Sequence, residues 1–215
     1  MSLSFRPRSD AERESICNAV SRTLSEETLA EMPRTLLRSL LQLACEDWQM
    51  KRMAADTAAS QQEEARRTLQ TAETAFHLSL QSLMVDTRTT QREAVSLQQL
   101  IGVSPSIFKQ MAISSQIRQA TLLREKLRAT DLICPSSQLS DFDTTFSSLI
   151  SANSAYEQAS QTKISQIRSL LDAQKQLDTA IGKTIRALQA LLSKGEIRAI
   201  FPAFVRQSAA KATPQ

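Results

Sequence analysis

The sequence predicts an all-α protein: an elongated coiled-coil or helical-bundle rod with two long helices, shorter connecting helices and no sheet. Three observations lead to this fold class. The 215 residues include only 3 Gly, 1 Trp and 1 Tyr, so the chain is poor in the residues that sheets and tight turns need. Residues 34–101 contain neither Pro nor Gly. Residues 137–193 repeat apolar side chains in alternate steps of three and four, which is typical of coiled coils.

The N-terminal part, residues 1–32, is predicted to hold a loose arm and one short helix over 9–24. Ser9 can cap this helix, and Glu12 lies three residues later, as in a capping box. Pro33 is tolerated only in the first turn of a helix, so a new helix is expected to begin near it.

The middle part, residues 33–193, is predicted to form the rod. Gly102 and the Ser104-Pro105 pair mark one break, because Ser caps a helix well and Pro suits its first position. Pro135 marks a second break, since the residue before a proline avoids helical angles. The expected helices cover about 33–101, 105–130 and 137–193.

A seam of apolar side chains runs along these helices, and we expect it to bind partner helices. Flanking apolar residues widen the seam of the last helix, and a wide seam needs more than one neighbouring helix. The chain alone is therefore expected to leave apolar surface uncovered. The predicted seam comprises Leu37, Leu41, Trp48, Leu69, Phe76, Leu83, Leu97, Phe142, Phe146, Leu149, Tyr156, Ile167, Leu170, Leu177, Ile181, Leu188 and Leu191.

The C-terminal part, residues 194–215, is predicted to be a separate apolar docking patch followed by a disordered basic tail. Gly195 can end the preceding helix. We expect the patch to dock in a groove of a partner protein, as compact apolar anchors do. The alternative is that it folds back onto the protein's own helices. The patch comprises Ile197, Ile200, Phe201, Phe204 and Val205.

The positive charge lies at the two ends of the chain. The net charge is +4, of which residues 1–8 contribute +2 and residues 194–215 contribute +3, so the remainder carries −1. A nucleic-acid binder would show a basic face with stacking aromatics on its folded part, and no specific nucleic-acid partner is expected. No apolar run has signal-peptide or membrane-span length, so the expected location is cytoplasmic (cytoskeleton) or nuclear, not secreted, without membrane contact.

Three cysteines occur at wide spacing: Cys17, Cys45 and Cys134. Their number is odd and no CxxC motif is present. A disulfide framework is therefore not expected, which favours a reducing compartment.

The sequence offers little for catalysis. The single histidine, His77, lies in an apolar helical segment without a second His or a nearby Cys, so no local metal site and no catalytic role are expected of it. The acidic pairs are interpreted as solvated ion pairs, and the isolated glycines form no phosphate-binding loop. No catalytic residue, metal, cofactor or small-molecule substrate is predicted.

The leading functional hypothesis is a non-enzymatic structural or scaffold subunit of a multi-protein coiled-coil assembly. Cytoskeletal complexes of the microtubule-, kinetochore- or axoneme-associated type use such helices, which is an analogy of architecture. The expected partners are other coiled-coil proteins, in a hetero-complex rather than a homodimer. The alternative is a BAR-like or tethering helical module that acts at membrane surfaces, for which basic residues along the rod would be needed.

Overall fold

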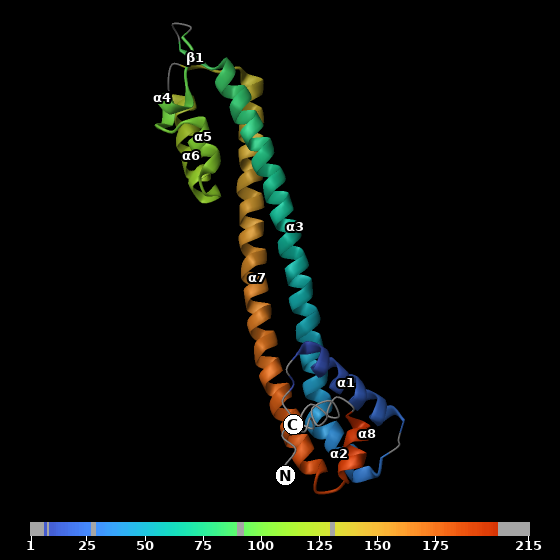
Figure 1. The fold of residues 1–215 in the computed structure, drawn as a ribbon. Helices are drawn as coiled ribbons and strands as arrows, with labels where there is room; N and C mark the ends of the chain where they lie inside the picture. Colours follow the sequence, from blue (N-terminus) through green and yellow to red (C-terminus); the bar gives the residue numbers. More distant parts are fainter. Residues whose placement is uncertain (1–6, 8, 27–28, 90–92, 130–131, 202–215) are drawn as a thin grey trace, which may run out of the picture. The chain divides into compact units, whose positions relative to one another are not determined.

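The computed structural model describes residues 7, 9–26, 29–89, 93–129 and 132–201. Within these ranges the fold is all-α, and its two long helices, α3 (Leu43–Asp86) and α7 (Ser136–Leu188), pack against each other (Figure 1). The chain folds into two compact units: unit 1 is drawn from residues 1–58 and 164–215, and unit 2 from residues 59–163. Both long helices contribute to each unit.

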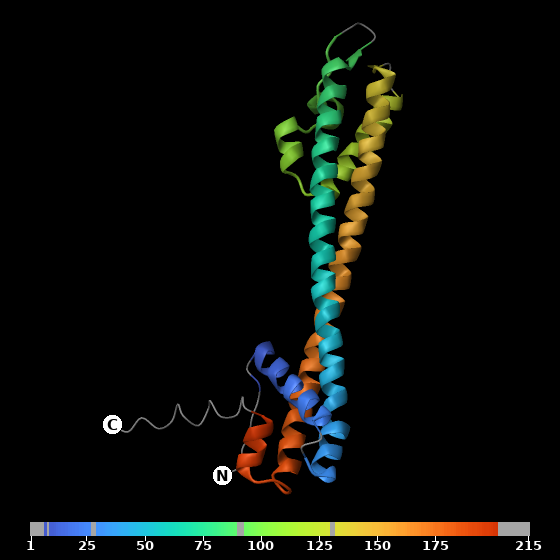
Figure 2. The same ribbon diagram turned by 90° about the vertical axis from the view of Figure 1, so that its right-hand side faces the viewer.

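Unit 1 gathers short helices around the beginning of α3 and the end of α7, which lie side by side (Figure 2). Ser9 caps the first helix by accepting a hydrogen bond from the Glu12 backbone N–H, and Pro33 lies in the first turn of the second, as predicted. The short elements are α1 (Asp10–Ser25), α2 (Glu31–Leu37), a π-helical turn η1 (Arg38–Gln42) that continues into α3, and α8 (Lys194–Ile200).

The core of unit 1 forms where these helices meet. Trp48 on α3 is fully buried, as are Leu177 on α7 and Cys17 on α1. Each helix therefore contributes one apolar face, and burial of these faces is the main driving force that holds the unit together.

Unit 2 combines the second part of α3 with the first part of α7. The short elements that connect these two helices in the sequence complete the unit. Its core is aromatic: the Phe76 ring lies 5.6–6.2 Å from the rings of Phe108, Phe142 and Phe146. Offset and tilted aromatic pairs of this kind add to the burial energy. The short elements are β1 (Arg88–Thr89), α4 (Leu97–Ile101), α5 (Pro105–Gln110), α6 (Ile113–Ala129) and β2 (Leu132–Ile133).

The prediction of one helix over 33–101 is wrong beyond Asp86. Residues 86–93 contain no apolar side chain, so a helix here would have nothing to bury. Thr87 instead donates its hydroxyl hydrogen to the Leu83 carbonyl, and β1 pairs antiparallel with β2. This two-residue pair is a small departure from the expected absence of any sheet.

The other two predicted helices also differ in their bounds. The helix expected over 105–130 begins at Pro105 under the Ser104 cap, but it breaks after Gln110 where Met111 adopts extended angles. The helix expected over 137–193 ends at Leu188. Gly195 does not end it, because Ser193 caps a new helix, α8, in whose first turn Gly195 lies.

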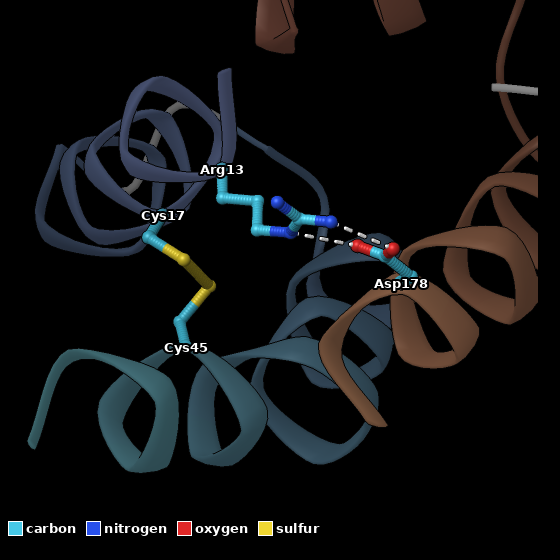
Figure 3. The surroundings of a disulfide bond; sticks show 4 residues. All are labelled: Arg13, Cys17, Cys45 and Asp178. Carbon is cyan, nitrogen blue, oxygen red and sulfur yellow. Dashed lines mark hydrogen bonds and ion pairs between the residues drawn. A yellow bond between two sulfur atoms is a disulfide. The ribbon is translucent and has the colours of Figure 1, made fainter. Parts of the chain in front are cut away.

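The cysteine prediction is wrong, because Cys17 on α1 and Cys45 on α3 form a disulfide (Figure 3). Their Cα atoms lie 5.4 Å apart, and both side chains are buried in the core of unit 1. Cys134 is a free, half-buried thiol. Disulfides persist in oxidising compartments, so cysteine usage no longer argues for a reducing one.

We predict that the double variant Cys17→Ser/Cys45→Ser lowers the free energy of unfolding by about 3 kcal/mol, because the bridge closes a loop with a sequence separation of 28. Denaturant titration followed by circular dichroism measures this change. Cys134→Ser is the matched control and should have a much smaller effect. Equal midpoints for the oxidised wild type and the double variant would contradict the prediction.

Candidate functional site

The predicted seam is mostly buried by the chain itself. Thirteen of its side chains lie in the cores of the two units, so most of the seam is not a surface for a partner chain. They are Leu37, Leu41, Trp48, Leu69, Phe76, Leu83, Leu97, Phe142, Phe146, Leu149, Leu177, Ile181 and Leu188.

Four seam residues depart from this pattern. Tyr156 and Leu170 are half-buried at the edges of their cores. Ile167 and Leu191 are 40% and 42% exposed. Leu191 leaves the seam because α7 has already ended at Leu188, so the helical periodicity no longer positions it. Ile167 lies on α7 itself, and its exposure marks an incomplete part of the seam.

The patch predicted to dock on a partner is, in its described part, folded back onto the chain. Ile197, Ile200 and Phe201 are all buried in the core of unit 1. The docking hypothesis is therefore corrected for these three residues in favour of the fold-back alternative. Phe204 and Val205 lie outside the described residues.

An open apolar face remains on α7 in unit 1. Ile164, Ile167 and Leu171 are 50%, 40% and 49% exposed, and their spacing of three and four residues places them on one side of the helix. We call these three residues the open α7 face. It is the strongest candidate for a partner-binding site among the apolar side chains of α7 that stay on the surface.

Helix α1 covers the continuation of this face. Arg13 Nε and Nη2 donate hydrogen bonds of 3.0 and 2.9 Å to the two carboxylate oxygens of Asp178, seven residues after Leu171 (Figure 3). Gln174 Nε2 donates to Asp10 at the first turn of α1. The hydrogen bonds that Arg13 donates to the Asp178 carboxylate raise the pKa of Arg13 above its ordinary value, so the guanidinium stays charged.

His77 belongs to a polar network in unit 2. The side chain of Gln116 is fully buried, and its Nε2 donates to Glu73 Oε1 at 2.9 Å and to the Met111 carbonyl at 3.0 Å. The opposite orientation of this amide would turn its oxygen toward the Glu73 carboxylate and the Met111 carbonyl, both of which are acceptors. The amide Oε1 must therefore face His77 Nε2, which lies 2.9 Å away. His77 therefore carries a proton on Nε2, and the expected structural role of this residue has a specific partner.

Metal-binding clusters and membrane spans are both absent from the described residues. Over these ranges, no group of three or more His, Cys, Asp or Glu side chains is placed to hold a metal ion. Within the same part of the chain, no helix is long and apolar enough to cross a membrane.

The sequence contained a signal for the open α7 face but none for the polar contacts. Ile164 and Leu171 flank the seam seven residues apart. The sequence therefore indicated that the apolar face of this helix is too wide for one neighbouring helix to cover. Arg13 and Asp178 are separated by 165 residues, and Gln116 and His77 by 39. Their pairing depends on which helices meet, which no local pattern contains.

The fold and its contacts define an all-α protein with two long paired helices. No protein-family model, curated protein or solved structure gives a significant match to this chain.

We predict a coupling free energy of about 1–3 kcal/mol between Arg13 and Asp178, because both side chains are only 13% exposed and their two hydrogen bonds are parallel. A double-mutant cycle with Arg13→Met and Asp178→Leu, followed by urea denaturation, measures it. The exposed Asp172–Lys175 pair on α7 provides the comparison and should couple by less than about 1 kcal/mol. Equal coupling in the two cycles would contradict the prediction.

We predict that Gln116→Leu lowers the free energy of unfolding by about 1–3 kcal/mol, since it removes the bonds to Glu73, His77 and Met111 at a buried position. Thermal denaturation measures the loss. Gln110→Leu changes an exposed glutamine in the same unit and should be nearly neutral. An imidazole Nε2–H signal of His77 that is unchanged in the NMR spectrum of Gln116→Leu would contradict the network.

Proposed function

We propose that this protein is a non-enzymatic scaffold subunit that binds an α-helix of another protein on the open α7 face. The observation that supports this most is the half-exposure of Ile164, Ile167 and Leu171, three large apolar side chains that form one stripe. A stripe of apolar residues at helical spacing fits the apolar face of a second helix.

The covered part of the same face indicates what the open part can bind. Ile164, Leu171, Asp178 and Ile185 follow one another at intervals of seven residues along α7. Asp178 is paired with α1, and Ile185 is only 2% exposed in the core of unit 1. Asp178 and Ile185 are thus packed by other helices of the chain itself. A helix of another protein is the matching partner for Ile164 and Leu171.

The N-terminal end of α1 determines where the open α7 face begins. The first residue of α1, Asp10, contacts Gln174, and the open residues lie N-terminal to that level on α7. A partner helix that packs along α7 on the N-terminal side of Gln174 would cover all three open side chains. Burial of the exposed half of each would contribute about 1 kcal/mol, so further contacts must complete the interface.

A second apolar surface in unit 1 is consistent with a subunit that has more than one partner. Leu43, Met50 and Met53 on α3 are each more than half exposed, with spacings of seven and three residues. Methionine side chains adapt to differently shaped partners, which suits an assembly surface.

Two of the three cysteines and the single histidine are engaged in structural contacts, which supports a non-enzymatic role. Cys17 and Cys45 are joined in the disulfide, and His77 Nε2 is bonded to Gln116. A cysteine nucleophile needs a free thiolate, which neither of these two cysteines offers.

The setting of the assembly remains a prediction. The cytoskeletal class and the alternative role at a membrane surface both rest on architecture, and membrane recognition would require a row of basic residues. A cytoplasmic or nuclear location is likewise a prediction, and the disulfide removes one of the arguments for it.

The proposal is tested by a photo-crosslinking amino acid at Ile167 in cells of the source organism, followed by reconstitution of the crosslinked pair from pure proteins. We expect the crosslink to reach a helical segment of another protein. Ile164→Glu/Leu171→Glu should weaken the reconstituted complex at least about 10-fold, because it places two charges in an apolar contact.

The matched control is Ser165→Glu/Gln176→Glu, which adds the same charge at two exposed polar positions of α7 in unit 1. It should leave the affinity unchanged. Equal weakening by both double variants would overturn the assignment of the face. A crosslink to a second copy of the chain, with a dimer mass in light scattering, or to residues 1–6 of the same chain would replace the proposed occupant.

A further inference from the structure

Unit 2 contains a cavity whose lining shares no residue with the open α7 face. It measures about 470 Å³, within the range of roughly 300–1,000 Å³ that small-molecule sites occupy. The C-terminal half of α3 forms one wall, and the residues around α4 and α5 form the other. Every residue that lines it belongs to unit 2.

Most of the lining is apolar. Leu80, Met84 and Val85 on α3 face the cavity together with Leu97 on α4 and Phe108 on α5. Phe108 and Leu80 also belong to the buried core of unit 2, so this wall is held by packing that does not depend on a ligand. A site of this kind suits a ligand with an aliphatic chain.

The cavity lining carries positive charge only. Lys109 is the one residue of the lining that carries a full charge, and no Asp or Glu lines the cavity. Lys109 is exposed in the last turn of α5 and forms no ion pair with the described part of the chain. An ammonium group at the edge of an apolar cavity complements an anionic head group.

Two polar residues of the lining, His77 and Ser96, are already engaged in hydrogen bonds within the protein. His77 lines the cavity, its Nε2–H is bonded to the buried Gln116, and its ring lies edge-on to Phe108 at 6.1 Å. Ser96 also lines the cavity, and its hydroxyl and backbone N–H are engaged with Gln99 in the cap of α4. Two polar side chains of the lining remain for a ligand, the exposed Gln81 and Lys109, and Lys109 is the one that carries a charge.

We propose that this cavity binds a medium-chain fatty acid, with the aliphatic chain against Leu80, Met84, Leu97 and Phe108 and the carboxylate at Lys109. Removal of each CH₂ group from water should tighten binding by about four-fold until the chain fills the cavity. This ligand site does not depend on the proposed partner helix, since the open α7 face belongs to the other unit.

The test is isothermal titration calorimetry of the full chain with decanoate, decanol and decyltrimethylammonium, each below its micelle concentration. We expect decanoate to bind most tightly, at one site per chain. Lys109→Ala should weaken decanoate by about 5- to 10-fold, leave decanol unchanged, and be rescued by Lys109→Arg. Stronger binding of decanol or of the cation would overturn the assignment of an anionic ligand.

A matched pair of variants separates the cavity from the general surface of α3. Val85 and Leu78 are 61% and 64% exposed and lie seven residues apart on α3, but only Val85 lines the cavity. Val85→Glu should weaken decanoate at least about 10-fold, because it places a like charge at the site, whereas Leu78→Glu should not. Equal effects of the two variants, with unchanged helicity by circular dichroism, would overturn the proposal.

Discussion

The structure depends on the burial of the apolar face that runs along the 53 residues of α7. No single neighbour can cover a face that includes both the seam and its flanking apolar residues, so the chain surrounds α7 with different elements in each unit. In unit 1 the neighbours are α1, α8 and the start of α3, and in unit 2 they are the rest of α3 and the short helices that contribute Phe108 and Leu123. Where these neighbours end, apolar surface remains.

Polar contacts give each unit a defined arrangement that apolar packing alone would leave loose. Arg13 and Asp178 set the position of α1 along α7, and the disulfide of Cys17 with Cys45 joins α1 to α3. In unit 2, Gln116 links Glu73, His77 and the carbonyl at which α5 ends. A buried amide with all its bonds satisfied tolerates only one packing of the surrounding helices, which is why it specifies the fold as well as stabilising it.

The two proposed binding surfaces differ in kind. The open α7 face is a row of exposed apolar side chains along one helix, which suits another helix. The cavity of unit 2 is concave and has a cationic edge, which suits a small anionic amphiphile. They share one physical origin. Short helices cover the long ones only in part, and each region that they leave uncovered has its own shape and charge.

The sequence by itself determined the helical class, the cap at Ser9, the break at Gly102-Ser104-Pro105 and most of the buried seam, because these follow from local periodicity and capping chemistry. It also indicated that α7 has a wider apolar face than one helix can cover. Only the tertiary structure decided that Cys17 meets Cys45, that Arg13 meets Asp178, that Ile197 and Phe201 fold back, and that the first long helix ends at Asp86. These outcomes depend on which distant segments come together, and periodicity along one helix carries no information about the helix that will lie beside it.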